Sequence, residues 1–119
     1  MNETLLKILV ILLIFVGESF SIYAEIVAAK HLVSQWAPFL KIFLQGFALI
    51  TVGWGCLVLG YMLGINALKS IWIIGVASIA SIIIMEPTIT WMIFKELPSK
   101  GALIGLILGI IGLICATFF

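Results

Sequence analysis

Residues 5–29 read LLKILVILLIFVGESFSIYAEIVAA, and this apolar run contains two carboxylates, Glu18 and Glu25. A transmembrane helix needs about 20 consecutive apolar residues, so the run predicts a helix that crosses a bilayer. If that helix enters the hydrocarbon near Ile8, Glu18 lies about 15 Å deeper, close to the middle of the membrane. A carboxylate at this depth costs several kcal/mol, and such residues usually mark a proton or substrate path. Glu18 is therefore the first candidate functional residue.

A second carboxylate shares the predicted helix face of Glu18. Glu25 follows seven residues later, which returns it to within about 20° of the same face, and Ser21 lies between them. We expect these three residues to bind a proton or a substrate. For Glu18 the alternative is a permanently protonated carboxyl that makes an interhelical hydrogen bond. For Glu25 the alternative is a solvated position at the interface, beside Lys30 and His31.

The composition places almost the whole chain in lipid. Its 119 residues are 65% hydrophobic and 9% charged, with a mean hydropathy of +1.41. Soluble domains of this size do not have such a composition, so we expect an all-α integral membrane protein. The net charge of +1 gives no support for nucleic-acid binding.

The residue types give no sign of an enzyme. The two cysteines, Cys56 and Cys115, sit in apolar runs, and the chain has one histidine, so no metal-ligand spacing is present. The sequence also lacks a nucleophile–base pair and a phosphate-binding loop. We therefore predict no enzymatic activity, no metal and no cofactor.

Four apolar runs predict four transmembrane helices with short loops, in a single domain that spans residues 1–119. The predicted helices cover about residues 5–29, 39–63, 67–94 and 102–119, with breaks at 30–38, 64–66 and 95–101. An even number of spans puts both termini on one side. More lysines flank the other side, which favours a cytoplasmic position for the first and third loops. We expect a multi-pass protein of a cell membrane, the inner membrane of a bacterium or an archaeon.

The third predicted helix carries a carboxylate of its own. Glu86 is followed by Pro87, which removes a backbone donor and interrupts the helix. Transport proteins often place broken helices beside their substrate path, so Glu86 is a candidate for that path. The alternative is a position near the interface, roughly two turns before Lys95.

Small residues form stripes on the second and fourth predicted helices. Gly46, Gly53 and Gly60 recur every seven residues and predict a smooth packing surface. The fourth helix has no charged residue. One of its faces predicts close helix packing, either within the chain or between chains, and carries Gly105, Gly109, Gly112 and Ala116.

Several of these features occur together in one family. The first helix holds a mid-membrane glutamate, the third opens with Trp72 and Gly75-Val76, and the fourth has glycines seven residues apart in IGLILGIIGLI, residues 104–114. A loop with Trp36 and Pro38 follows the first helix. In these features the chain resembles the small multidrug resistance family, the four-helix branch of the drug/metabolite transporter superfamily. The stretch EPTITWMIFKELPSKGALIGLILGIIGLI, residues 86–114, is similar to the closing half of the larger, ten-helix EamA-like members.

The resemblance implies a dimer, with the fourth helix as its main seam and the other three helices lining a chamber. The second chain is either another copy, for which an antiparallel arrangement is one option, or a paralogous subunit. The resemblance further implies a proton-coupled exporter of a small hydrophobic or cationic compound. The residues that it suggests for proton and substrate binding are Glu18, Glu25, Ser21, Trp72, Lys69 and Glu86.

The chain also departs from that family. Lys69 stands three residues before Trp72, where the family has a tyrosine, and a lysine near the chamber would repel a cation. This favours an alternative function, a flippase or flippase subunit for a lipid-linked polyprenyl phosphate. An alternative of another class is a non-transporting assembly subunit of a membrane complex.

Overall fold

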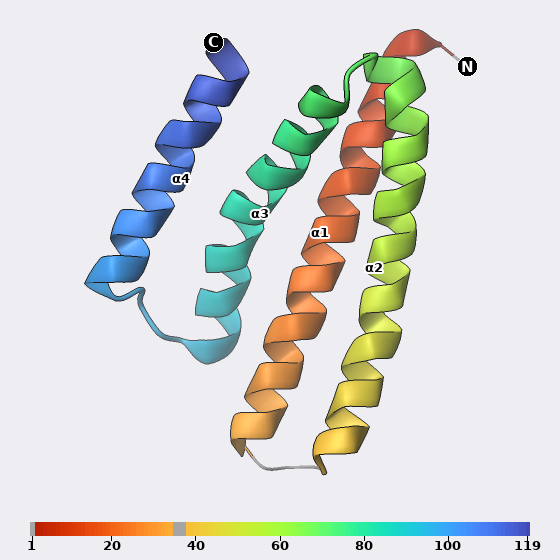
Figure 1. Ribbon diagram of the computed structural model, residues 1–119. Helices are drawn as coiled ribbons and strands as arrows, with labels where there is room; N and C mark the ends of the chain where they lie inside the picture. The colour runs from red at the N-terminus through yellow and green to blue at the C-terminus, as the bar shows by residue number, and fades with distance from the viewer. Residues whose placement is uncertain (1, 35–37) are drawn as a thin grey trace.

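The protein is a bundle of four helices, as the computed structural model in Figure 1 shows. The structure describes residues 2–34 and 38–119, with the side chains of 32–34 left out, so the predicted loop residue Trp36 lies outside the described residues. The prediction of an all-helical chain with four helices is confirmed, and each helix is long and apolar enough to cross a membrane. The helices are α1 (Glu3–Ser34), α2 (Phe39–Leu68), α3 (Ile71–Phe94) and α4 (Lys100–Phe118).

The helices alternate in direction, so both ends of the chain lie at the same end of the bundle, as predicted (Figure 1). This end also holds the turn between α2 and α3, whereas the opposite end holds the connection between α3 and α4. Helices α1 and α3 therefore run in the same direction and lie side by side.

The turn between α2 and α3 lies later in the chain than the sequence predicted, so the predicted break at 64–66 is wrong. Helix α2 instead continues to Leu68. Gly64 is buried within it, and because glycine has no side chain, Val10 and Ile74 approach its backbone closely. A Cβ at Gly64 would lie only 3.0 Å from each of these side chains. The helix ends where Lys69 adopts a left-handed conformation (φ 62°), and α3 begins at Ile71 rather than at residue 67.

Pro87 does not end α3, and the helix reaches Phe94 as predicted. Helix α3 runs from Ile71 to Phe94 with Pro87 inside it. Because proline has no N–H group, the carbonyl of Ile83 loses its usual helical partner, and the surrounding turns carry the helix past this point.

Helix α1 is the centre of the bundle and packs against both α2 and α3. On α2 the predicted glycine stripe forms the contact: a Cβ at Gly53 would lie 2.9 Å from the carbonyl oxygen of Gly17, and one at Gly60 would lie 3.0 Å from Ile14. Gly46 approaches Ala28 in the same way. The packing role predicted for this stripe is confirmed.

Helix α4 is attached much more loosely than the other three. It contacts α3 and neither of the other helices, and it has no buried residue. A non-helical stretch joins it to α3, and the hydroxyl oxygen of Ser99 at its end accepts a hydrogen bond from the Ala102 N–H, which caps α4. Within the chain α4 leaves most of its surface uncovered.

Candidate functional site

The contact between α1 and α3 contains Glu18, the carboxylate predicted to lie near the middle of a membrane. The Ser78 hydroxyl on α3 donates a hydrogen bond to Oε1 of Glu18 on α1. Ser78 is 8% exposed and Glu18 is half-buried, so the pair lies within the bundle rather than on its outer surface. Glu18 thus faces a neighbouring helix, which is where an ionisable group in a membrane helix is least costly.

The two other carboxylates of interest also lie along the contact between α1 and α3. Residue 18 of α1 is bonded to residue 78 of α3, and the Lys30 ammonium group donates to the Ile93 carbonyl oxygen at 2.6 Å. Since the two helices are parallel, this register puts Glu25 opposite Glu86, and the charges of these two carboxyls interact. Glu25 is exposed and also lines a groove toward α2, so it lies at the edge of this contact. The three carboxyls follow the contact between α1 and α3, which we call the α1–α3 seam.

Lys30 lies at one end of the α1–α3 seam and contacts the end of α3. The Lys30 ammonium group, besides donating to the Ile93 carbonyl, lies 5.9 Å from the centre of the Phe94 ring. The last carbonyls of a helix have no partner within the helix and carry partial negative charge, so a lysine satisfies them well. Lys30 thereby ties the end of α1 to the end of α3.

Ser21 lies on a different side of α1 from the one predicted. Its hydroxyl donates to the Gly17 carbonyl oxygen of its own helix at 2.9 Å and is packed against α2, where a Cβ at Gly53 would lie 2.6 Å from it. Ser21 is 4% exposed. Three residues rotate a helix by about 300°, which is enough to turn Ser21 from α3 toward α2. It is a packing residue of the contact between α1 and α2.

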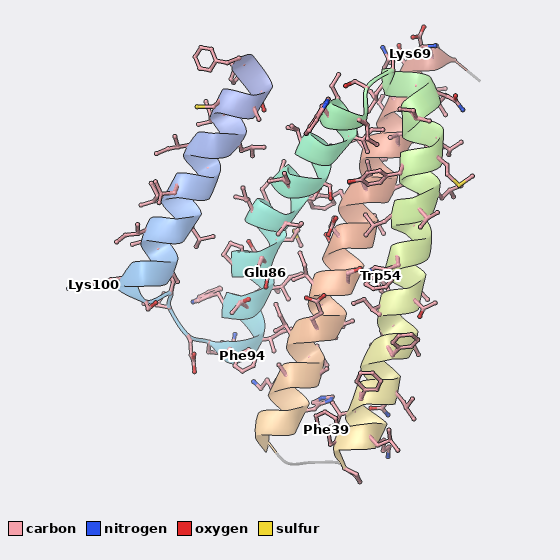
Figure 2. The ribbon with its side chains drawn as sticks, in the orientation of Figure 1. Phe39, Trp54, Lys69, Glu86, Phe94 and Lys100 are labelled. Carbon is pink, nitrogen blue, oxygen red and sulfur yellow. The ribbon has the colours of Figure 1, made fainter. Side chains whose placement is uncertain are left out.

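Lys69 and Trp72 are remote from the carboxyls. Lys69 is exposed at the turn between α2 and α3, at the end of the bundle that holds the termini, whereas Glu86 lies toward the other end (Figure 2). Trp72, one helical turn from Lys69, is 82% exposed. The structure therefore does not bring these two residues to the α1–α3 seam.

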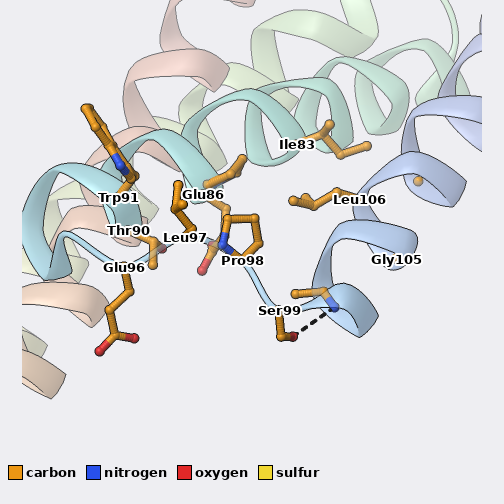
Figure 3. Close-up of a pocket in the computed structure, with 13 residues that line it drawn as sticks. Ile83, Glu86, Thr90, Trp91, Glu96, Leu97, Pro98, Ser99, Gly105 and Leu106 are labelled. Atoms are coloured by element: carbon orange, nitrogen blue, oxygen red, sulfur yellow. Dashed lines mark hydrogen bonds between the residues drawn. The ribbon is translucent and has the colours of Figure 1, made fainter.

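A pocket of about 650 Å³ lies between α3 and α4 (Figure 3). Glu86 lines it from the side of α3, with Thr90 and Trp91 one turn further on, and Glu96 borders it from the connecting stretch. On the side of α4, Gly105 and Gly109 line the pocket and fill none of it with side chains. The complete lining is Ile83, Glu86, Pro87, Thr90, Trp91, Glu96, Leu97, Pro98, Ser99, Ala102, Gly105, Leu106 and Gly109.

The predicted small face of α4 is thus divided. Gly105 and Gly109 face α3 across the pocket, and a Cβ at Gly109 would lie 3.5 Å from Ile83, an ordinary contact. A Cβ at Gly112 would have no other atom of the described chain within 4 Å, and Ala116 is exposed. The seam between chains that we expect at this face stays a prediction.

Sequence reasoning missed Ser78, the partner of Glu18. Ser78 and Ser81 are three residues apart in an apolar run and are both buried, which marks the polar side of α3. The Ser81 hydroxyl, however, donates to the Ala77 carbonyl of its own helix. Only the register between α1 and α3 distinguishes the two serines, and that register depends on tertiary packing.

The described part of the chain contains no group of three His, Cys, Asp or Glu residues close enough to hold a metal ion. Comparisons with family models, with curated proteins and with solved structures found no match for the chain. Its function must therefore be inferred from the site itself.

Proposed function

We propose that this chain is a small membrane transporter of the drug/metabolite type, which exchanges protons for a small hydrophobic cation. The observation that carries the proposal is the Glu18 carboxyl, which faces α3 inside the bundle and accepts a hydrogen bond from Ser78. Glu25 and Glu86 extend a row of carboxyls along the same seam. Ionisable residues are rare in membrane helices, and those that face the bundle interior commonly serve ion or proton paths.

The exchange mechanism follows from the chemistry of a desolvated carboxyl. A carboxylate away from water gains stability from a proton or from a cationic substrate, and the two compete for the same oxygens. The Ser78 hydroxyl holds the Glu18 side chain toward α3 in either state, because it donates to a carboxyl oxygen and leaves the other oxygen open. Proton release on one side of the membrane then permits substrate binding, and protonation on the other side expels the substrate.

The position of Lys69 supports a cationic rather than an anionic substrate. The alternative of a lipid-linked phosphate depended on a lysine near the chamber, and Lys69 lies at the exposed turn at the end of the bundle. The acidic side chains along the α1–α3 seam, from Glu18 to Glu86, give it a negative character. Such a seam favours cations.

We further propose that two chains form the transport unit. Four helices offer little enclosed volume, and α4 has no buried residue within the chain. A second copy or a paralogous subunit that packs on α4 would cover this surface and enclose a polar path. A lipid-facing α4 is the alternative, since hydrocarbon also covers an apolar helix.

The test uses purified protein in liposomes with an imposed pH gradient and a panel of organic cations, organic anions and polyprenyl phosphates. Glu18→Gln mimics the protonated carboxyl, so we expect proton-coupled transport to be lost while the fold is retained. Glu3→Gln is the matched control, because Glu3 is exposed and pairs with Lys7 at 3.7 Å at the start of α1. Normal transport by Glu18→Gln with an unchanged pH profile would show that the carboxyl is structural.

One observation favours a second candidate, a non-transporting assembly subunit. The uncovered surface of α4 is what a helix that docks on a larger membrane complex would present. An assembly subunit should tolerate Glu18→Gln and lose its function when bulk is added to α4. A transporter should show the opposite sensitivity at Glu18.

A further inference from the structure

The pocket between α3 and α4 has the size and form of a small-molecule site. Its volume of about 650 Å³ lies within the range of about 300–1,000 Å³ that is usual for ligand pockets. Its floor is the C-terminal half of α3, and its far wall is the small face of α4 (Figure 3). Gly105 leaves this side of the pocket open, and a Cβ there would meet no other atom of the described chain within 4 Å.

The chemistry of the lining selects for a cation with an apolar body. Two carboxylates, Glu86 and Glu96, border the pocket, and its lining residues include no Lys, Arg or His. Most of the other lining residues are apolar, including Ile83, Pro87 and Leu106. An anion would be repelled by the carboxylates, and a small hydrated ion would leave the apolar wall unused.

An aromatic ring beside Glu86 already accepts a cation. Trp91 lines the pocket one turn after Pro87, and the Lys95 ammonium group lies 5.7 Å from the centre of its ring. Indole rings attract cations through the negative charge of the ring face. An organic cation would have to displace the Lys95 ammonium group to gain the same attraction, and it would then also lie near a carboxylate.

Glu86 belongs both to this pocket and to the α1–α3 seam. Its side chain lines the pocket, and its charge interacts with that of Glu25 on α1. Glu86 therefore places one carboxyl of the pocket beside the α1–α3 seam.

We propose that the pocket between α3 and α4 is the site where a small amphipathic organic cation binds, with its charge at Glu86 and its apolar body against Gly105 of α4. As the place where the substrate first binds, the site rests on the transport function proposed above. Binding itself requires only the pocket, so the two proposals are tested by different measurements.

The binding test uses two probes of the same shape and opposite charge, tetraphenylphosphonium and tetraphenylborate. Binding to the full chain in detergent is followed by calorimetry and by the tryptophan fluorescence. We expect the phosphonium to bind at least about tenfold more tightly than the borate, since the lining is anionic. Equal binding of the two ions would show partition into apolar surface alone and would overturn the proposal.

Gly105→Leu adds bulk to the pocket, and its Cβ would meet no other atom of the described chain within 4 Å. We expect it to weaken phosphonium binding about tenfold or more, the effect of losing the apolar wall position. Gly55→Leu is the matched control: it is equally open, lies on α2, and does not line the pocket. If both variants or neither lose binding, the ligand does not occupy this pocket.

Glu86→Gln tests the carboxyl and should reduce the preference for the phosphonium over the borate, whereas Glu3→Gln should leave it unchanged. Should Glu86→Gln fail to fold, the Gly105 and Gly55 pair still decides the question. Charge-selective binding that Gly105→Leu abolishes, without proton-coupled uptake in liposomes, would uphold the site and refute the transport function. Uptake that Gly105→Leu leaves intact would refute the site alone.

Discussion

Ser78 is the residue through which α3 holds the mid-membrane carboxyl of α1. Glu18 accepts its hydroxyl hydrogen bond, and Ser81, three residues further on, bonds instead to its own helix. We expect Ser78→Ala to lower the free energy of unfolding by about 1 kcal/mol, the usual net value of a hydrogen bond between membrane helices. Unfolding in mild detergent, followed by circular dichroism, measures this loss.

The control for that measurement is Ser81→Ala, which removes a buried hydroxyl of the same size from the same helix but breaks no bond between helices. Its loss of stability should be clearly smaller. If the two alanine variants are equally stable, the bond between Ser78 and Glu18 contributes nothing measurable to the bundle.

The pH dependence of substrate binding also belongs to single residues. A cationic substrate and a proton compete for the Glu18 carboxyl, so the substrate's apparent affinity should fall as the pH is lowered. Glu18→Gln carries no charge at any pH and should make this profile shallower, whereas the part that comes from Glu86 in the proposed pocket should remain. An anionic substrate would instead hold or gain affinity at low pH. Binding measured across a pH series distinguishes these outcomes.

At this scale the sequence was informative about Glu18 and uninformative about its partner. A carboxylate within a long apolar run can be recognised from a single sequence, because placing it in a membrane helix costs free energy. The partner Ser78, 60 residues away, depends on how α1 and α3 are aligned along each other, which periodicity does not encode. The same reason explains the misplacement of Ser21, which packs toward α2.

At the scale of elements, the glycines of α2 determine how closely it packs on α1. A Cβ at Gly53 would lie 2.9 Å from the backbone oxygen of Gly17 and 2.6 Å from the Ser21 hydroxyl, so the helices must separate to admit it. We expect Gly53→Ala to destabilise the bundle by about 1–3 kcal/mol, the range for overpacking. Thermal unfolding in detergent provides the measurement.

Gly55→Ala is the companion variant on the same helix. Its Cβ would meet no other atom within 4 Å, so alanine there should be neutral or slightly stabilising, since alanine favours a helix more than glycine does. Similar losses for both variants would mean that the glycines act through helix propensity rather than through the contact with α1.

The helix boundaries show where local signals fail. Gly64 and Asn66 are residues that often form turns, yet α2 passes through them. Gly64 serves there to let Ile74 pack closely on the helix, because glycine has no side chain. The turn falls at Lys69, a residue with no special preference for the left-handed conformation that it adopts. Tertiary contacts overrode local preference at both places.

At the scale of the whole molecule, the number of helices and the position of the termini followed directly from hydropathy, since each apolar run must satisfy its backbone as a helix. The pocket between α3 and α4 did not, because its existence depends on how far α4 stands from α3. Glycines on α4 predicted a close contact, and the structure instead has two of them lining open volume.

The proposed assembly of two chains makes a prediction at Gly112. A leucine there would meet nothing else in the described chain, so Gly112→Leu should leave the monomer intact and weaken only a seam between chains. We expect a larger monomer fraction by light scattering in mild detergent. Gly109→Leu should weaken the dimer too, but it also adds bulk beside Ile83.

Gly55→Leu on α2 serves as the reference for that experiment, because its position is equally open and lies outside α4. A monomer fraction that is unchanged by Gly112→Leu, or changed to the same extent by Gly55→Leu, would place the seam elsewhere than on the small face of α4.

The long separation between bonded residues on α1 and α3 has a consequence for biogenesis. A ribosome makes α1 with Glu18 and Glu25 first, and the α3 groups that bond to Glu18 and Lys30 follow 60 and 63 residues later. In the interval, the hairpin of α1 and α2 can close through its glycines, but Glu18 has no hydroxyl to bond. The nascent hairpin therefore depends on the membrane insertion machinery, or on water held there, until α3 is synthesised. Quality control by membrane proteases would find its clearest signal, an unpaired carboxyl in lipid, in chains that stall before Ser78.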